Sequence, residues 1–352
     1  MVSSTPIPPD ETFMELALLE ARKGVGQTSP NPAVGAVIVV SRNGRPEVVA
    51  RGWHRRAGEA HAEVEALRAL PEASLARGAT LYVTLEPCST HGRTPPCTGA
   101  IIRAGIRRVV IGTLDPNPAH AGRALGLLQQ AGIEVTHGVL ETACRRLNRA
   151  FNHWIVTGGP WVTAKAGFSL DGRITRAPGT PRWITSELSR ADTHRHRAEV
   201  DAILIGGGTL RDDNPQLTVR GVSGARQPWR VVVTQSGNLP ADATLFTDEH
   251  RERTLVFTGK PLREVLVELG QRGVTSVMIE GGMRVLGEAF DERLVHEVCF
   301  YMAPLLLGGP KVVIGGEGVG SYAEAWRIVD PKVVRLGGDL KLSGELAWGE
   351  RP

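Results

Sequence analysis

The first half of the chain alternates between short apolar runs and amphipathic segments. Apolar residues recur on one side of residues 10–23, where Thr12 and Glu15 stand at capping-box spacing, so a helix is predicted there. Further helices are predicted from near His61 to residue 70 and at 98–104, 122–131 and 141–156, and strands at 33–40, 47–54, 79–85, 107–114 and 133–136. This alternation is typical of a layered α/β domain whose pocket is formed by loops at strand ends.

A second α/β pattern follows the sequence Gly158-Gly-Pro160, which marks a domain boundary. Strands are predicted at 161–170, 202–209, 230–234, 254–258, 276–282 and 297–307, and helices at 186–197, 261–272 and 283–290. Two of these strands run into glycine-rich segments, which suits backbone approach to phosphate groups, although paired glycines more often form an ordinary turn. Neither segment matches Gly-x-Gly-x-x-Gly or a P-loop, which disfavours an ordinary Rossmann or kinase domain.

The length of 352 residues predicts two domains. We expect a disordered arm at 1–9, a first domain at 10–157 and a second at 158–352. A hydrophobic content of 41%, with no long apolar run, indicates a soluble globular protein rather than a membrane protein. The net charge of +4 is spread along the chain, so nucleic acid is not expected as a partner. Four cysteines without a signal peptide point to the reducing cytoplasm.

The segment from His61 to Cys97 contains the strongest candidate for a chemical site. His61, Cys88 and Cys97 offer one imidazole and two thiols, which are good zinc ligands, and three ligands leave a position open for catalysis. A histidine followed two residues later by glutamate, with Pro-Cys and a second cysteine downstream, is typical of zinc deaminases of bases and nucleosides. In such sites the glutamate, here Glu63, is not a ligand but carries protons from the attacking water to the ring and the leaving amine.

Other interpretations of this segment remain open. Cys88 and Cys97 could form a disulfide or be plain buried thiols. A zinc-stabilised binding module would need a fourth ligand, for which His91 is the neighbouring candidate. The rival enzyme is a deaminase of free nucleosides or of tRNA bases with an unrelated second domain. A tRNA enzyme should present a basic, aromatic-rich face, but aromatic residues make up only 5% of the chain and no basic cluster is evident.

Several motifs together resemble the bifunctional riboflavin-biosynthesis deaminase–reductase family over nearly the whole chain. In the first half these are Pro30-Asn-Pro-Ala-Val-Gly35, His61-Ala-Glu-Val64, Leu85-Glu-Pro-Cys-Ser89, Gly92-Arg-Thr-Pro-Pro-Cys97 and Leu114-Asp-Pro-Asn-Pro118. In the second half they include Ser169-Leu-Asp-Gly-Arg173, Trp183-Ile-Thr185, Asp201-Ala-Ile-Leu204, Leu217-Thr-Val-Arg220, Glu280-Gly-Gly282 and Ala303-Pro-Leu-Leu-Leu-Gly308.

The resemblance implies a cytidine-deaminase-like α/β/α zinc domain followed by a dihydrofolate-reductase-like α/β domain. The first domain would deaminate 2,5-diamino-6-ribosylamino-4(3H)-pyrimidinone 5′-phosphate with Zn²⁺, and the second would reduce the ribosyl group to ribityl with NADPH. The resemblance also implies Asn31 at the pyrimidine, and His54 and Arg93 at the substrate phosphate. We expect a phosphorylated small-molecule substrate and a homo-oligomer, with neither nucleic acid nor a membrane as partner.

Matching positions in the second half imply two sets of residues. The NADPH set is Gly167, Trp183, Thr209, Asp213, Gly282, Met283, Arg284, Val285, Leu286, Gly287 and Glu288. The reductase substrate set is Arg197, Leu217, Arg220 and Glu280. Two structural alternatives are that Trp183 belongs to the core and that Arg197 pairs with Asp201, one helical turn further on.

Three positions depart from the family pattern. Thr90 and Glu65 replace common histidines, and Pro181 replaces a common serine that contacts the substrate. Proline has neither a hydroxyl nor an N–H to donate. The alternative function is therefore a deaminase with a catalytically silent reductase domain.

Overall fold

The computed structural model describes residues 9–90, 95–118, 120–174 and 183–349. Nearly all of the predicted N-terminal arm, together with His91, Arg93 and Pro181, lies outside these residues. Contacts divide the chain into two compact units, Met1–Thr157 and Gly158–Pro352. No helix in the described part is long and apolar enough to cross a bilayer.

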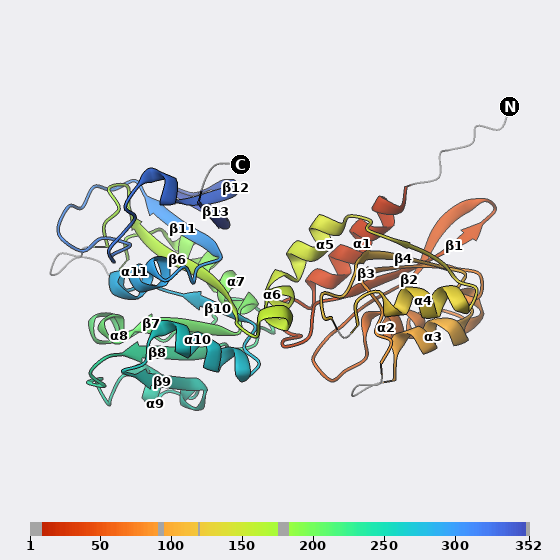
Figure 1. Cartoon of the computed structure of the whole chain (residues 1–352), viewed down its shortest axis with the longest axis horizontal. Helices are drawn as coiled ribbons and strands as arrows, with labels where there is room; N and C mark the ends of the chain where they lie inside the picture. Colours follow the sequence, from red (N-terminus) through yellow and green to blue (C-terminus); the bar gives the residue numbers. More distant parts are fainter. Residues whose placement is uncertain (1–8, 91–94, 119, 175–182, 350–352) are drawn as a thin grey trace. The chain divides into compact units, whose positions relative to one another are not determined.

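The first unit is a five-stranded sheet with helices on both faces (Figure 1). The strand order is β2-β1-β3-β4-β5; β1 is antiparallel to β2 and β3, whereas β3, β4 and β5 are parallel. The strands are β1 (Gly35–Arg42), β2 (Arg45–Trp53), β3 (Thr80–Leu85), β4 (Arg108–Thr113) and β5 (Glu134–His137). One face is covered by α1 (Asp10–Arg22) and α5 (Glu141–Leu147), and the other by α2 (Ala62–Arg68), α3 (Cys97–Ala104) and α4 (Arg123–Gln130).

Two glycines bring helices unusually close to this sheet. A Cβ atom on Gly35 would lie 2.0 Å from the carbonyl oxygen of Ala17 in α1. A Cβ atom on Gly52 would lie 2.3 Å from the backbone nitrogen of Ala66 in α2. Only glycine fits at such distances. The second contact holds the end of β2 against α2, so residues that follow β2 lie near the start of that helix.

The structure corrects two details predicted for this unit. The helix predicted at 141–156 is divided into α5 and α6 (Arg149–Thr157). At the break, the side chain of Asn148 accepts a hydrogen bond from the Ala33 N–H at 2.8 Å and donates one to the Ala33 carbonyl at 2.9 Å. The capping box at Thr12 is absent, because α1 begins at Asp10 with Pro9 at the N-cap.

The second unit is an eight-stranded sheet in the order β12-β13-β11-β6-β10-β7-β8-β9. Strands β11, β6, β10, β7, β8 and β9 form a parallel sheet in this order. At one edge, β13 pairs antiparallel with β11, and β12 pairs antiparallel with β13. The parallel strands are β6 (Trp161–Ser169), β7 (Ala202–Gly206), β8 (Trp229–Thr234), β9 (Thr254–Thr258), β10 (Ser276–Ile279) and β11 (Glu297–Ala303). The mixed α/β folds of both units confirm the predicted fold class.

Helices cover this sheet as well. One apolar cluster joins the sheet to α10 (Leu262–Gln271) and α11 (Met283–Asp291). The other face packs against α8 (Gly207–Asp213) and α9 (Thr244–Thr247), and against the residues that follow α8. Helix α7 (Glu187–Glu199) has Ser186 as its N-cap, and the Ser186 side chain accepts a hydrogen bond from the Ser189 N–H.

The last two strands, β12 (Trp326–Leu336) and β13 (Asp339–Trp348), were not predicted from the sequence. Most of β12 is exposed, and its register shifts between Val329 and Lys332. An exposed strand with a bulge does not show the apolar alternation on which strand prediction depends.

Candidate active sites

The three predicted metal ligands lie together in the first unit. Their ligand atoms are all within 4.8 Å of one another, and no other such His, Cys, Asp and Glu group occurs among the described residues. His61 is the N-cap of α2, and its Nδ1 lies 3.5 Å from Cys88 Sγ and 3.3 Å from Cys97 Sγ. Cys88 follows β3, and Cys97 is the first residue of α3. One imidazole nitrogen and two sulfurs at this spacing fit a zinc ion.

The two thiols influence each other's ionisation. Their mutual hydrogen bond lowers the pKa of Cys88 to about 4 and raises the pKa of Cys97. The backbone N–H of Cys97 also donates to Cys88 Sγ at 3.2 Å. The pair therefore shares one negative charge, and a divalent cation would favour thiolate at both positions. All four cysteines are free, so the disulfide alternative is wrong.

Glu63 lies in the first turn of α2 and is 3% exposed. Burial, and then the negative charge of Cys88, raise the pKa of its carboxyl to about 7. A cation held by the three ligands would act in the opposite direction. A carboxyl with a pKa near neutrality can both accept and donate a proton, as a general acid–base must.

Asn31 and His54 form a pair beside this cluster. Nδ1 of His54 lies 3.0 Å from the carbonyl oxygen of Ala60. Since a carbonyl only accepts, Nδ1 carries the proton and Nε2 accepts from the Asn31 amide at 3.1 Å. His54 is 2% exposed, burial lowers its pKa, and its ring meets the His61 ring edge-on at 5.2 Å. The described contacts of His54 are thus with Asn31 and the metal-ligand region.

Glu86 is a residue that the sequence analysis did not single out. Its buried carboxylate accepts hydrogen bonds from the backbone N–H groups of Asp115 at 3.1 Å, Gly122 at 2.9 Å and Ala124 at 3.0 Å. These contacts tie the loop after β4 to the chain just before Cys88. The available signal was a glutamate directly after the apolar strand predicted at 79–85 and before Pro-Cys, a place where burial is expected and a carboxylate needs partners.

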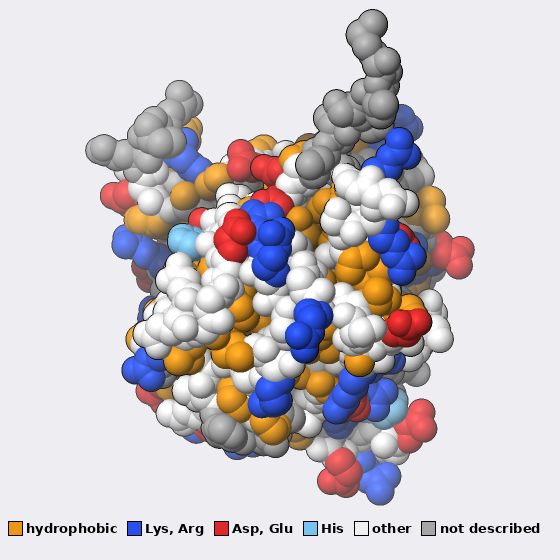
Figure 2. Space-filling model, turned by 90° about the vertical axis from the view of Figure 1, so that its right-hand side faces the viewer, with side chains coloured by type: hydrophobic (Ala, Val, Ile, Leu, Met, Phe, Trp, Pro, Cys, Tyr) orange, Lys and Arg blue, Asp and Glu red, His pale blue; other side chains and the backbone are white. Residues whose placement is uncertain are grey.

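The remaining predicted positions of this unit are less informative. Glu65, at one of the departures from the family pattern, points to Arg55 and Arg68 rather than to the metal ligands. Thr90 is exposed. Charged side chains of both signs are scattered among apolar ones on the molecular face in Figure 2.

In the second unit, Arg197 and Glu280 form a buried ion pair. Nε and Nη2 of Arg197 contact the two carboxylate oxygens of Glu280 at 2.5 and 2.8 Å, and Lys165 Nζ lies 3.5 Å away. The alternative pairing of Arg197 with Asp201 is wrong, because Asp201 instead pairs with Arg226. Lys165 was missed; its signal is a cation within the largely apolar strand β6.

Burial raises the pKa of Glu280, but Arg197 and Lys165 outweigh it, so the pKa falls to about 2. Nearby, His194 has its pKa lowered to about 4 by burial and by the charges of Arg197 and Arg220. This group of cations around one carboxylate makes the region suitable for an anionic ligand.

Leu217 and Arg220 lie in the segment after α8. The Leu217 side chain is 2% exposed and packs in the core, so only its backbone can face a ligand. Arg220 is exposed and donates to Gln216 Oε1 at 2.7 Å and to Thr218 Oγ1 at 2.9 Å.

The glycine-rich ends of β7 and β10 lie against each other. Gly281 and Gly282 have φ angles of +96° and +85°, which strongly favour glycine. A Cβ atom on Gly282 would lie 3.0 Å from Thr209 Oγ1, whereas one on Gly167 would lie 3.1 Å from Thr185 Cγ2. Backbone groups at a helix start beside glycines without side chains suit the phosphates of a dinucleotide. Asp213 is the last residue of α8.

It is mainly the first residues of helix α11 that are placed where a ligand could contact them. Gly282 is its N-cap, followed by Met283 and the exposed Arg284, whereas Val285 and Leu286 are buried in the core. A Cβ atom on Gly287 would lie 2.4 Å from the Gly316 nitrogen, and Glu288 accepts the Leu262 N–H at 2.9 Å. The core alternative for Trp183 is wrong, since this residue is 52% exposed and Arg190 lies over its ring.

Comparison with known proteins decides the family. The model of the cytidine and deoxycytidylate deaminase zinc-binding region matches residues 8–113, and the RibD C-terminal domain matches residues 160–342. Riboflavin biosynthesis protein RibD of Bacillus amyloliquefaciens is 40% identical over 361 residues, covering 95% of each chain. This chain belongs to the RibD family. The RibD of Escherichia coli (strain K12) is 41% identical over 85% of this chain and 89% of its own.

Solved structures agree with this assignment. Acinetobacter baumannii RibD, form 1, superposes with a TM-score of 0.88 at 35% identity, covering 96% of this chain and 99% of that chain. A Thermotoga maritima protein described as a diaminohydroxyphosphoribosylaminopyrimidine deaminase/5-amino-6-(5-phosphoribosylamino)uracil reductase has a TM-score of 0.86 at 35% identity, covering 96% and 98%.

As a RibD protein, the chain is a bifunctional deaminase and reductase of riboflavin biosynthesis that uses zinc and NADPH. The second domain matches the RibD C-terminal domain, so the rival enzyme, a nucleoside or tRNA deaminase with an unrelated second domain, is excluded. The same comparisons exclude a non-enzymatic zinc module and disfavour a silent reductase domain.

Proposed function

We propose that the first unit hydrolytically deaminates 2,5-diamino-6-ribosylamino-4(3H)-pyrimidinone 5′-phosphate and that the second unit then reduces its ribosyl group to ribityl. The product would be 5-amino-6-(5-phosphoribitylamino)uracil. The observation that carries the first step is a buried carboxyl, Glu63, beside three converging ligands, His61, Cys88 and Cys97. The description of the Thermotoga maritima relative supports the same pair of activities.

In the deamination, His61, Cys88 and Cys97 would hold the zinc ion, and a zinc ion at this position would supply an acidified water for attack on the ring. Glu63 would take a first proton from that water and pass it to the ring nitrogen as the oxygen adds to the ring carbon. It would then take the second proton, from the added hydroxyl, and pass it to the amine as the carbon–nitrogen bond breaks. Burial raises the pKa of its carboxyl and so opposes the lowering that the cation would cause, which favours both uptake and release of the proton. Removal of the amine as ammonia and gain of a carbonyl oxygen balance the reaction.

Asn31 orients the pyrimidine. Because its amide NH2 group is directed at His54 Nε2, its amide oxygen is left to accept a hydrogen bond from a ring or exocyclic N–H. The resemblance assigned His54 to the substrate phosphate, but a neutral, 2% exposed imidazole with partners on both nitrogens is better suited to fixing Asn31. Arg93 remains our candidate for the phosphate, since guanidinium groups bind phosphate with two hydrogen bonds.

In the reductase, Arg197, Lys165 and Arg220 provide positive charge for the phosphorylated substrate, and Glu280 keeps Arg197 in place. NADPH supplies the hydride. The phosphates of NADPH would bind at the start of α11, to Gly282, Met283 and Arg284, with Thr209 beside Gly282. The predicted cofactor set also includes Gly167, Trp183 and Asp213. Protein groups need only position the nicotinamide against the open-chain sugar carbon.

We further propose that the enzyme acts in the cytoplasm as a homo-oligomer, without nucleic acid or membrane partners. The free thiols at positions 88 and 97 support a reducing compartment.

The test is one coupled assay. The zinc-loaded protein is incubated with the diaminopyrimidine ribosyl phosphate, first without and then with NADPH, while ammonia and nicotinamide absorbance are followed. We expect ammonia in both cases and NADPH oxidation only after deamination. Ammonia without NADPH oxidation would contradict the reductase half, and no ammonia with zinc bound would contradict the proposed substrate.

A further inference from the structure

The segment Asn214–Arg220, called here loop 214–220, has a backbone that needs outside support. It forms the first part of the connection between α8 and β8 and contains Arg220, which we place at the reductase substrate. Asn214 and Leu217 have positive φ angles, +39° and +51°, in a region that non-glycine residues rarely adopt. Such conformations persist where the surrounding structure enforces them, and they are frequent near functional sites.

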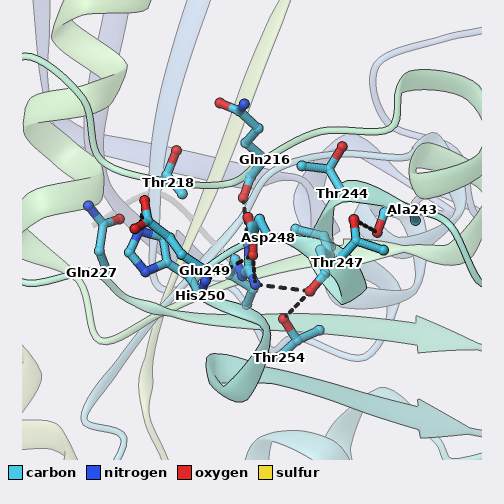
Figure 3. Close-up of polar contacts among 12 residues, drawn as sticks. Gln216, Thr218, Gln227, Ala243, Thr244, Thr247, Asp248, Glu249, His250 and Thr254 are labelled. Atoms are coloured by element: carbon cyan, nitrogen blue, oxygen red, sulfur yellow. Dashed lines mark hydrogen bonds and ion pairs between the residues drawn. The ribbon is translucent and has the colours of Figure 1, made fainter.

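A buried guanidinium supports loop 214–220 from the sheet side. Arg230 in β8 is 1% exposed, and its Nη1 donates to the Gln216 carbonyl at 3.3 Å and to Asp248 at 2.6 Å. Its Nη2 donates to the Leu245 carbonyl at 2.9 Å and to the second oxygen of Asp248 at 2.8 Å. Figure 3 shows Gln216 and Asp248 close together at this cluster, with Thr254 next to them. One side chain thus links loop 214–220 to the segment around α9.

Further hydrogen bonds complete the support. The side chain of Asn214 accepts the Thr244 N–H at 2.8 Å, which is a second link to the α9 segment. From the opposite side, Arg197 donates to the Thr218 carbonyl at 3.0 Å, and His194 accepts the Arg220 N–H at 3.2 Å. Loop 214–220 therefore lies between the Arg230–Asp248 pair and the Arg197–Glu280 pair.

We propose that Arg230, oriented by Asp248, is a positioning residue for the reductase reaction. It fixes loop 214–220, and this places Arg220 at the substrate. The same loop holds Arg197 in place, because Arg197 donates to the Thr218 carbonyl. This inference rests on the substrate assignment proposed above. A buried ion pair contributes little net stability compared with apolar side chains of similar size, so stability alone is a weak reason for an arginine here. The guanidinium is instead suited to its place because its rigid fork reaches a carboxylate and two carbonyls at once.

The test is the Arg230→Lys variant of the full-length, zinc-loaded enzyme. A single ammonium can pair with Asp248 but cannot span both carbonyls. We expect KM for the deaminated ribosylaminouracil phosphate to rise about tenfold, the effect of losing one well-made hydrogen bond. The Kd for NADPH and the rate of ammonia release should change less than about twofold, since they report other parts of the chain. Hydrogen exchange at residues 216–218 should become faster.

Arg108→Lys is the matched control. Arg108 makes the same two-pronged contact with an aspartate, Asp10, at 2.9 and 2.7 Å, but in the first unit. It should leave the reductase KM unchanged. A lower melting temperature in Arg230→Lys with unchanged KM and unchanged exchange would overturn the proposal and leave Arg230 a purely structural residue.

A double-mutant cycle with Arg220→Ala separates this inference from the substrate assignment. If Arg230 acts through Arg220, the two substitutions raise KM less than the product of their separate effects. If Arg220→Ala leaves KM unchanged while Arg230→Lys raises it, the assignment of Arg220 fails but positioning by Arg230 stands. Fully independent effects of the two variants on KM would overturn the proposed route through Arg220.

Discussion

Arg197 and Glu280 lie 83 positions apart in the chain, yet two guanidinium nitrogens of Arg197 contact both carboxylate oxygens of Glu280. This contact joins α7 to the end of β10 and is almost completely buried, with side-chain exposures of 12% and 6%. It holds Glu280 ionised in a buried place and, on the proposed function, orients Arg197 for the phosphorylated substrate.

Replacing Arg197 by alanine should impair reductase substrate binding. We expect KM of the reductase to rise about 10- to 100-fold, because a charge-assisted contact is lost and Glu280 loses its main partner. Zinc content and ammonia release should stay at the wild-type level. Arg197→Lys is the control and should lose less. A defect in deamination would contradict separate sites.

The same ion pair predicts a pH dependence of stability. The pKa of Glu280 in the folded protein is about 2, below its ordinary value of 4.5. Its contribution to stability is therefore present above about pH 4.5 and is lost as the pH falls toward 2. Denaturant unfolding of the second unit, followed between pH 6 and pH 3, should show this loss in the wild type. Glu280→Gln should show a smaller loss over the same interval; an equal loss would assign the effect to other carboxylates.

Glu63→Gln should abolish deamination while zinc remains bound. General acid–base catalysis contributes about 10²- to 10⁴-fold, and the amide cannot carry the proton, so ammonia release should fall by that factor. Zinc content by elemental analysis and NADPH oxidation with the deaminated substrate serve as controls. Loss of zinc would instead identify Glu63 as a ligand.

His91 tests whether the zinc site is open. Three protein ligands suit catalysis, so His91→Ala should retain zinc, as should the control Thr90→Ala, whereas Cys88→Ala should lose it. Replacement of zinc by Co²⁺ provides a second readout, since the absorption bands from cobalt–thiolate bonds should be the same in His91→Ala as in the wild type. Zinc loss in His91→Ala would indicate a closed, four-ligand site.

His54→Phe should affect the substrate side of the deaminase. The phenyl ring is slightly larger than the imidazole and can neither donate to the Ala60 carbonyl nor accept the hydrogen bond from Asn31, so the amide loses its fixed orientation. We expect KM for deamination to rise about tenfold, in line with one lost hydrogen bond, and zinc to remain bound. If Asn31→Ala adds nothing to the effect of His54→Phe, the two residues act as one unit. Fully additive effects would contradict this.

Gly282→Ala should weaken NADPH binding. Its φ of +85° is strained for alanine, and the added methyl would meet Thr209 Oγ1 at 3.0 Å. A cost of about 1–3 kcal/mol corresponds to a rise in Kd of about 5- to 150-fold, measurable by nicotinamide fluorescence. Gly208→Ala is the matched control, because nothing lies within 4 Å of its Cβ position and its φ is ordinary. Equal effects of both substitutions would argue against a special role for Gly282.

Several features of this protein follow from the sequence alone. The periods of apolar residues predicted most of the helices and strands, because burial of one face repeats along a strand or helix. The sequence also predicted His61, Cys88 and Cys97 as ligands and Glu63 as the proton carrier, since each stands at a predicted helix start or strand end, and the structure brings the three ligand atoms together. The ability of these side chains to bind zinc or carry a proton also depends more on residue type than on distant neighbours. The exposed strand β12 was missed because it lacks the apolar alternation.

Tertiary structure decided which side chains became partners. Strand β10 lies between β6 and β7, and this order brings Glu280 to Lys165 and Arg197 rather than leaving Arg197 with Asp201. The core encloses Leu217, and the approach of β2 to α2 brings His54 beside the metal ligands. Such pairings depend on strand order and register, which involve residues far apart in the chain, so local periodicity carries no information about them.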